Sequence, residues 1–184
     1  MIKIISCLFV ILFSANFVYS QGSDSIIDTS LTLSERIFKD SISALNIQNE
    51  LFSTSRKAYN EGLKLFNDQN FDDAIVSFTN AIIIDSSFSQ AYFYRGKCHE
   101  FSNNNLAISD YEMVFNLDSS DLSPLYSIAR IQALNDIHIA IETYNFIISS
   151  NDHQSKAYYE LGVLSYLKND FEAAVKYFTK AIAI

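Results

Sequence analysis

The chain has few of the residues that interrupt helices or form nucleotide-binding loops. It contains one proline and four glycines among 184 residues. Hydrophobic residues make up 49% of the chain, which is enough for a packed core and more than a disordered protein carries. Four scattered glycines cannot build the glycine-rich loop that cradles nucleotide phosphates. The composition therefore favours a packed helical protein and argues against a nucleotide-dependent enzyme.

Residues that act as nucleophiles, general bases or metal ligands are also scarce. The two cysteines, Cys7 and Cys98, form no CxxC pair, and no GxSxG sequence occurs. His99, His138 and His153 show neither HxxxH nor HxxE spacing, so the chain has no zinc motif. Two interpretations of Cys98 are open, a catalytic thiol or a small buried apolar residue, and the second is favoured. We expect no catalytic residue, no metal site and no cofactor.

Positive charge is in short supply as well. The chain has 13 Lys and Arg against 21 Asp and Glu, for a formal net charge of −8. Lys3 is the one charged residue among the first 20, so removal of that segment leaves 12 basic and 21 acidic residues, a net charge of −9. A surface of this sign repels phosphate backbones. We therefore expect no nucleic-acid partner.

The first 20 residues are predicted to be a signal peptide rather than part of the fold. A basic start at Lys3 precedes the apolar run Ile4–Phe13, which is too short to span a bilayer. Small Ser20 precedes the cleavage point that we place before Gln21. The sequence thus predicts a secreted or periplasmic chain without a membrane span after cleavage. An uncleaved anchor and a lipid-modified Cys7 are the alternatives.

Three sets of residues recur along the rest of the chain with a period of 33 or 34. A small residue occurs at Gly62, Gly96, Ala129 and Gly162, an alanine at Ala74, Ala107, Ala140 and Ala174, and an aromatic residue at Phe78, Tyr111, Tyr144 and Phe178. This period is typical of two helices of about 13–15 residues joined by short turns. The predicted repeats cover about 55–88, 89–121, 122–154 and 155–184.

These recurring residues are expected to serve packing. The small residues of both helices let the helices approach closely, and the aromatic residue four positions after the alanine lies on the same helix face and fills the space between hairpins. In the two middle repeats the small residue and the alanine are 11 positions apart instead of 12. We place the missing residue in the turns near Asn103–Asn105 and Asn135–Asp136, and we expect those turns to be tighter.

The segment between the signal and the repeats is predicted to hold a linker and one helix. Residues 21–31 are polar and are expected to be a flexible lead. The four residues from Thr32 to Glu35 have the pattern of a capping box, in which both side chains bond to free amides at a helix start. We expect an N-terminal capping helix over 32–53 that covers the open flank of the first repeat, because terminal elements of solenoids are commonly atypical.

With these features the chain resembles the tetratricopeptide repeat (TPR) family over 55–184. The resemblance rests on Tyr59, Gly62, Phe71, Ala74, Phe78, Ala81, Asp85, Tyr158, Tyr159, Leu161, Gly162, Phe171, Ala174, Phe178 and Ala181. It implies an all-α fold, a right-handed superhelical α-solenoid of four helix-turn-helix repeats with an N-terminal helix. It also implies a non-catalytic scaffold that binds a peptide segment or a partner protein in a concave groove.

The resemblance also implies which residues line that groove, since one face of each first helix does so in TPR proteins. These residues are Arg56, Tyr59, Leu63, Phe66, Phe93, Lys97, Tyr126, Arg130, Lys156, Tyr159 and Tyr166. An aromatic ladder with basic side chains beside it suits an extended peptide with acidic groups. The other interpretation is that the aromatic residues only pack and the basic residues are ordinary solvated charges.

One branch of the family clamps a terminal carboxylate of chaperone tails with basic and amide side chains. The corresponding positions here hold Tyr59, Leu63, Ser123 and Ser127. The resemblance therefore argues against co-chaperone activity.

The end of the last predicted helix leaves open how its apolar side chains are covered. Val175, Phe178 and Ile182 face this problem. The interpretations are truncation of a longer protein at Ile184, end-to-end association with another copy, and a tolerated short end. The leading functional hypothesis is the peptide-binding scaffold. The alternative is the N-terminal sensory or docking region of a larger membrane or enzymatic protein.

Overall fold

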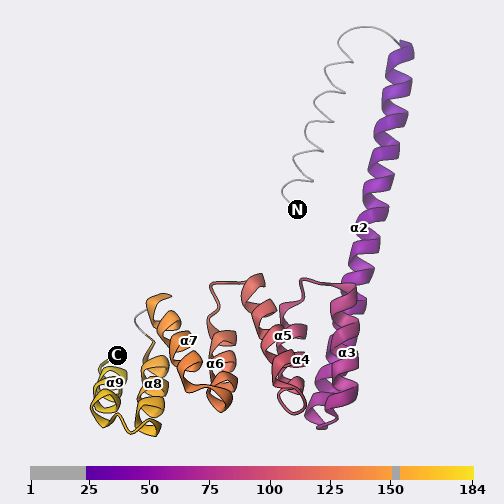
Figure 1. Ribbon diagram of the computed structural model, residues 1–184. Helices are drawn as coiled ribbons and strands as arrows, with labels where there is room; N and C mark the ends of the chain where they lie inside the picture. Colours follow the sequence, from indigo (N-terminus) through magenta and orange to yellow (C-terminus); the bar gives the residue numbers. More distant parts are fainter. Residues whose placement is uncertain (1–23, 151–153) are drawn as a thin grey trace. The chain divides into compact units, whose positions relative to one another are not determined.

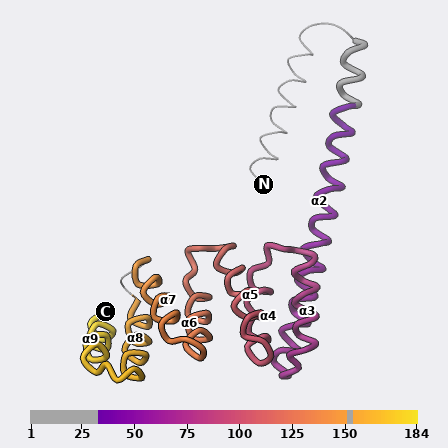
Figure 2. The backbone as a smooth tube through the Cα atoms, viewed as in Figure 1, coloured from indigo at the N-terminus to yellow at the C-terminus, as the bar shows by residue number. Residues whose placement is uncertain are grey.

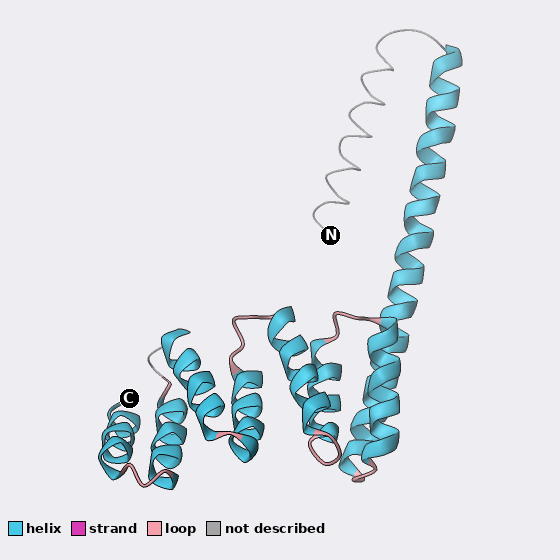
Figure 3. Ribbon diagram, viewed as in Figure 1, coloured by secondary structure: helices cyan, strands magenta, loops and turns pink. Residues whose placement is uncertain are grey.

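Every regular element that the structure describes is a helix. The computed structural model describes residues 24–150 and 154–184, with side chains from residue 33 onward (Figure 1; Figure 3). The helices are α2 (Asp24–Asn67), α3 (Phe71–Ile84), α4 (Ser89–His99), α5 (Asn104–Leu117), α6 (Ser123–Asn135), α7 (Ile137–Ser150), α8 (Ser155–Leu167) and α9 (Phe171–Ala183). The predicted signal peptide and its cleavage point lie outside the described residues.

A boundary between Leu51 and Phe52 divides the chain into two compact units. The second unit contains the end of α2 and all later helices. In it, consecutive hairpins contact each other through α3 and α4, α5 and α6, and α7 and α8 (Figure 1; Figure 2). Within the later hairpins, α4 packs on α5, α6 on α7 and α8 on α9. This order of contacts along the chain is that of a helical solenoid, so the all-α superhelical repeat fold expected from the sequence is confirmed.

The recurring small and aromatic residues meet in the core of each hairpin. A Cβ atom added to Gly62 would lie 2.6 Å from Phe78 Cε1, and one added to Gly162 would lie 2.6 Å from Phe178 Cε1. The same atom on Gly96 would lie 3.1 Å from Tyr111. The aromatic ring therefore occupies the space that a side chain would need, which is the close approach that the sequence predicted.

The turns of the outer repeats share one hydrogen-bonding pattern. After α2, the amide of Asn70 donates to the carbonyl of Leu65, and Gln69 adopts a φ of 60°. After α8, the amide of Asp170 donates to the carbonyl of Ser165, and Asn169 adopts a φ of 63°. Both are Schellman-type ends, in which a left-handed residue reverses the chain direction.

The two middle repeats, which are one residue shorter between the small residue and the alanine, differ in where that residue is missing. Only Asp136 separates α6 from α7, so the tighter turn predicted there is confirmed. In the second repeat the prediction is wrong, because four residues separate α4 from α5 and α4 has shortened to 11 residues. The helix ends early, and the residues after His99 form the loop instead. In this loop the Asn103 side chain accepts hydrogen bonds from the amides of Asn105 and Leu106 and caps α5.

The predicted flexible lead and separate helix over 32–53 are replaced by one helix. Helix α2 begins at Asp24 and continues without a break to Asn67. The cause is that no proline and no glycine before Gly62 interrupts this stretch, so the capping-box residues Thr32 to Glu35 lie inside a helix rather than at its start. Within the described ranges, no helix is both long enough and apolar enough to cross a membrane.

Candidate peptide-binding groove

The predicted ladder residues occupy one position in the first helix of each repeat, and each packs on its own second helix. The ring centroids of Tyr59 and Phe78 are 5.8 Å apart, those of Phe93 and Tyr111 5.6 Å, those of Tyr126 and Tyr144 6.1 Å, and those of Tyr159 and Phe178 5.7 Å. These spacings fit tilted aromatic pairs. The ladder rings therefore have a packing role in the fold, in addition to any contact with a ligand.

The first section of the groove is an aromatic cluster between repeats one and two. Tyr59 lies 4.8 Å from Phe88 and 6.0 Å from Tyr94 by ring centroids, and Phe66 lies 5.5 Å from Tyr94. Leu63 packs in the same cluster and is half-buried. Tyr94 belongs to the next repeat, so its ring joins the two repeats in a way that the sequence prediction missed.

The guanidinium of Arg56 lies beside this section and is exposed. It sits 5.5 Å above the ring centroid of Phe52 in a cation–π contact. Its charge is thus available at the surface of the first repeat.

The central section joins a cation, an ion pair and two rings. The ammonium of Lys97 lies 5.4 Å from the Phe93 ring centroid. Arg130 forms an ion pair with Glu100, and the hydroxyl of Tyr111 donates a hydrogen bond to the other oxygen of the same carboxylate at 2.5 Å. Glu100 therefore neutralises Arg130, and this part of the groove is less cationic than its predicted residues imply.

The third section holds Lys156 over an aromatic ring beside a hollow. Its ammonium lies 4.7 Å from the Tyr126 ring centroid, and the Tyr126 hydroxyl donates to Gln154 Oε1 at 2.9 Å. The hollow has a volume of about 660 Å³ and is lined by Ser119, Ser120, Asp121, Leu122, Ser123, Tyr126, Ser150, Gln154 and Lys156. This site therefore offers an oriented cation, an aromatic face and several hydroxyl groups within one depression.

The two last predicted residues are exposed. Tyr159 is 54% exposed and Tyr166 is 59% exposed. Tyr166 contacts Phe171 across the α8–α9 turn at a centroid distance of 5.6 Å. Both rings offer apolar surface at the C-terminal end of the array.

Glu100 and Gln154 are the main residues that the sequence prediction missed. Glu100 follows Gly96 by four positions, as Phe66 follows Gly62, so a strict register would have placed it in the groove. Phe101, the next residue along the chain, stacks on Phe71 at a ring-centroid distance of 4.2 Å and lies in the turn after α4. Gln154 precedes α8, outside the helix face on which the prediction was based.

Two buried and two half-buried tyrosines act as neutral hydrogen-bonding groups. Burial raises the pKa of Tyr111, and the neighbouring Glu100 carboxylate raises it further. Burial also raises the pKa of Tyr144, of Tyr126 and of Tyr59. Each hydroxyl therefore keeps its proton and can donate to a carbonyl or carboxylate.

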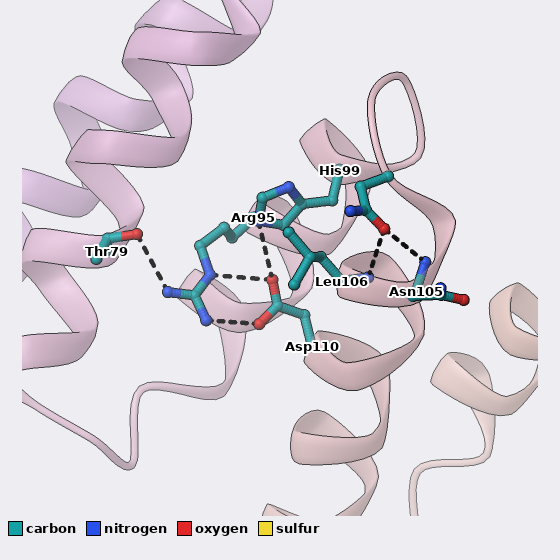
Figure 4. Close-up of polar contacts among 7 residues, drawn as sticks. Thr79, Arg95, His99, Asn105, Leu106 and Asp110 are labelled. Atoms are coloured by element: carbon teal, nitrogen blue, oxygen red, sulfur yellow. Dashed lines mark hydrogen bonds and ion pairs between the residues drawn. The ribbon is translucent and has the colours of Figure 1, made fainter.

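The strongest polar cluster is structural rather than part of the groove (Figure 4). Arg95 of α4 donates to both carboxylate oxygens of Asp110 at 3.0 and 2.6 Å, and to the hydroxyl of Thr79 on α3 at 3.1 Å. His99 Nε2 lies 4.0 Å from Asp110 Oδ2, and His99 Nδ1 is buried without a hydrogen-bond partner. The cluster links three helices, α3, α4 and α5.

The neighbouring Cys98 is a free, fully buried thiol. Burial, reinforced by the Asp110 charge, raises its pKa to about 11. A thiol in this state is a poor nucleophile, which agrees with the packing interpretation. Among the described residues no group of three or more His, Cys, Asp or Glu could hold a metal ion.

Comparison with curated proteins finds a repeat-containing relative. The chain is 25% identical over 124 residues to the TPR repeat-containing protein MJ1428 of Methanocaldococcus jannaschii. The match covers 67% of this chain and 22% of that protein, so the chain spans about a fifth of the length of its relative. No family model matches the chain.

Solved structures with the same fold include several TPR proteins. A crystal structure of MamA aligns with a TM-score of 0.62 at 21% identity, over 82% of this chain and 91% of that one. YrrB, described as a TPR protein with an unusual peptide-binding site, aligns with a TM-score of 0.58 at 16% identity, over 79% and 82%. The first TPR of Spaghetti (RPAP3), bound to an HSP90 peptide, aligns with a TM-score of 0.55 at 18% identity, over 64% and 94%. These likenesses show the TPR fold.

Proposed function

We propose that this chain is a non-catalytic scaffold that binds an extended peptide segment of a partner protein in the groove of its first helices. The observation that carries the proposal is the placement of two ammonium groups, Lys97 and Lys156, over aromatic rings at 5.4 and 4.7 Å. No ion pair involves either group within 24–150 and 154–184. Their N–H groups therefore remain free for a ligand.

The chemistry of the two positions favours a peptide with acidic side chains. Each ammonium is oriented by a ring face, which reduces the entropy lost when a carboxylate binds it. Arg130 contributes less, because Glu100 already neutralises it. Of the three solved structures named above, one is described with a bound peptide and one with a peptide-binding site, which supports a peptide rather than a small molecule as the ligand.

Charge reversal at both lysines tests this proposal. The K97E/K156E variant should lose at least about tenfold in affinity for a panel of acidic 12-residue peptides, because each charge-assisted contact contributes roughly 1.5–3 kcal/mol. Fluorescence anisotropy at two salt concentrations measures the affinity, and the loss should shrink at high salt.

The matched control is the K168E/K176E variant, which reverses two exposed lysines outside the groove. It should bind as the unchanged chain does, with the same helical circular dichroism in all three proteins. Equal affinity of K97E/K156E and the unchanged chain would rule out the acidic-peptide groove.

We also propose that the chain acts outside the cytoplasm, after cleavage before Gln21. The support is the basic start and short apolar run of the first 20 residues. An alternative role is the sensory or docking region of a larger membrane or enzymatic protein. It is supported by the relative in which the matched segment is 22% of the whole.

Self-association through α9 is a second candidate activity. It is supported by the exposure of Val175 and Ile182, which are 66% and 86% exposed. Apolar side chains of this size, gathered on one helix, commonly mark a contact surface.

A further inference from the structure

The last repeat presents an apolar depression where a fifth repeat would pack. It has a volume of about 480 Å³ and is lined by Ser155, Lys156, Tyr159, Phe178, Ala181 and Ile182. We call these six residues the C-terminal face. Ile182 is 86% exposed and Tyr159 is 54% exposed, while Phe178 and Ala181 are partly covered.

The same face occurs inside the array, where it is covered. Its counterpart in the first repeat consists of Tyr59, Phe78, Ala81 and Ile82. There Phe78 and Ala81 are fully buried and Ile82 is 8% exposed. The comparison shows that the C-terminal face has the residues of a helix-docking surface and that no helix of the described residues covers it.

The internal interface defines the kind of helix that covers such a face. Helix α4 and the residue before it provide Phe88, which contacts Tyr59 at 4.8 Å, and Tyr94, which contacts Phe78 at 5.9 Å. Between them Ala91 is fully buried in a cluster with the counterparts of Ala181 and Ile182. The required pattern is an aromatic residue, a small residue three positions on, and a large apolar residue about one turn further.

The chain itself exposes a helix with this pattern in its other unit. In α2, Phe38 is followed by Ser41 and Leu45, and Phe38 and Leu45 are 50% and 47% exposed. Leu33, Ile37 and Ile47 are also large, apolar and exposed. At 100° per residue, Phe38, Ser41 and Leu45 lie within about 60° of one another around the helix, so they form one stripe.

We propose that the C-terminal face of one copy of this chain binds the α2 segment 33–51 of a second copy, with Ser41 seated where Ala91 sits in the internal interface. The inference deepens the proposed self-association, and its face shares Lys156 and Tyr159 with the last part of the peptide groove. Each copy carries one face and one α2 segment. The contact is therefore heterologous, so copies join head to tail and the assembly lengthens with concentration unless it closes into a ring.

Disulfide trapping between two variants tests the pairing directly. One chain carries S41C and the other I182C, both in a C7S/C98S background. The mixture should give a disulfide-linked S41C–I182C heterodimer, identified by mass spectrometry of the joined peptides. The matched control is S43C, because Ser43 lies two residues further on and about 200° around the same helix. A mixture of S43C and I182C should give no disulfide-linked heterodimer.

The alternative occupants give different products. Trapped S41C–S41C pairs would show that α2 binds another α2, and I182C–I182C pairs would show that two C-terminal faces meet. Either product as the main species overturns the proposal, and so does a yield from S43C equal to that from S41C.

Sedimentation velocity provides a second readout without cysteines. The weight-average mass of the full chain should rise with concentration, and A181E on the face or S41E on α2 should each abolish the rise. S43E and K176E are the controls that should leave it unchanged. A monomer at every concentration overturns the proposal. Peptide binding by S41E should be unaffected, because Ser41 lies outside the groove, so failure of this inference and failure of the groove proposal can be told apart.

Discussion

At the scale of single residues, the tightest constraint is the contact between a glycine and an aromatic ring. Gly62 and Gly162 have the same geometry, with 2.6 Å from an added Cβ to the ring of Phe78 or Phe178. The rings differ in their freedom, because Phe78 is fully buried and Phe178 is partly exposed. The same substitution therefore meets a fixed ring in one repeat and a movable ring in the other.

This difference predicts unequal costs for two alanine substitutions. G62A should destabilise the chain by about 1–2 kcal/mol, because overpacking of about 1–3 kcal/mol exceeds the gain of up to about 1 kcal/mol from replacing a helical glycine. G162A should be close to neutral, since Phe178 can turn aside. Urea unfolding measures both. Equal destabilisation would mean that Phe178 is held as rigidly as Phe78.

At the scale of elements, helices α3, α4 and α5 are held together by a polar link absent from the later repeats. Arg95 binds Asp110 and Thr79, whereas the equivalent positions of Arg95 in repeats three and four hold buried Ile128 and Leu161. A nearly buried ion pair fixes the arrangement of the helices that it joins more reliably than it raises the free energy of unfolding. The link therefore adds a connection between α3, α4 and α5 in the repeat whose first helix is two residues shorter than α6 and α8.

The histidine beside this link predicts acid sensitivity of the second repeat. Burial lowers the pKa of His99, and Arg95 lowers it further, although Asp110 acts in the opposite direction. The unfolded chain takes up this proton near the ordinary value of about 6.5, and the native chain only at lower pH. The free energy of unfolding should therefore fall as pH drops below about 6.5, by at most about 1.4 kcal/mol per pH unit.

Urea unfolding at pH 7.5, 6.5 and 5.5 measures this slope. H99Q should reduce it, and H138Q, which changes an exposed histidine, should leave it in place. A slope that persists in H99Q would assign the acid sensitivity to other groups.

At the scale of the whole molecule, export and thiol chemistry are connected. If cleavage before Gln21 removes Cys7, Cys98 is the only cysteine left. Its burial and its pKa of about 11 keep the thiol protonated and covered. Such a chain can pass through an oxidising compartment without forming disulfide-linked dimers.

The corresponding prediction concerns the exported protein. Intact mass spectrometry of the extracytoplasmic fraction should show a chain that begins at Gln21. Its single thiol should not react with a thiol reagent at pH 8 until denaturant is added. A chain that begins at Met1 and stays in the cytoplasm would contradict the signal-peptide interpretation.

The core could be predicted from sequence because its residues recur. Gly62, Ala74 and Phe78 repeat at a fixed period, and their contacts depend only on helix geometry. The groove was harder, because a residue on the right face can be neutralised by a neighbour from another repeat, as Glu100 neutralises Arg130. Whether such ion pairs form depends on the distance between neighbouring repeats, and the spacing of residues along one helix does not predict that distance.

The first helix was misjudged for a related reason. Thr32 to Glu35 forms a capping box only if a helix begins there. Residues 24–67 contain no proline. A helix that continues through Thr32 leaves fewer backbone amides without a hydrogen bond than a helix that begins there. The tighter turn predicted after α4 was wrong because a one-residue deletion can shorten either the turn or the preceding helix.

The stiffness of an array of stacked hairpins depends on its joints, that is, on the interfaces between consecutive repeats. Here each joint has a directional bond as well as apolar packing: Arg95 to Thr79, Glu100 to Arg130, and Tyr126 to Gln154. Directional bonds resist sliding and twisting in a way that apolar contacts do not. We expect these bonds to limit how far the spacing of the ladder rings changes when a peptide binds, which lowers the free-energy cost of adjustment.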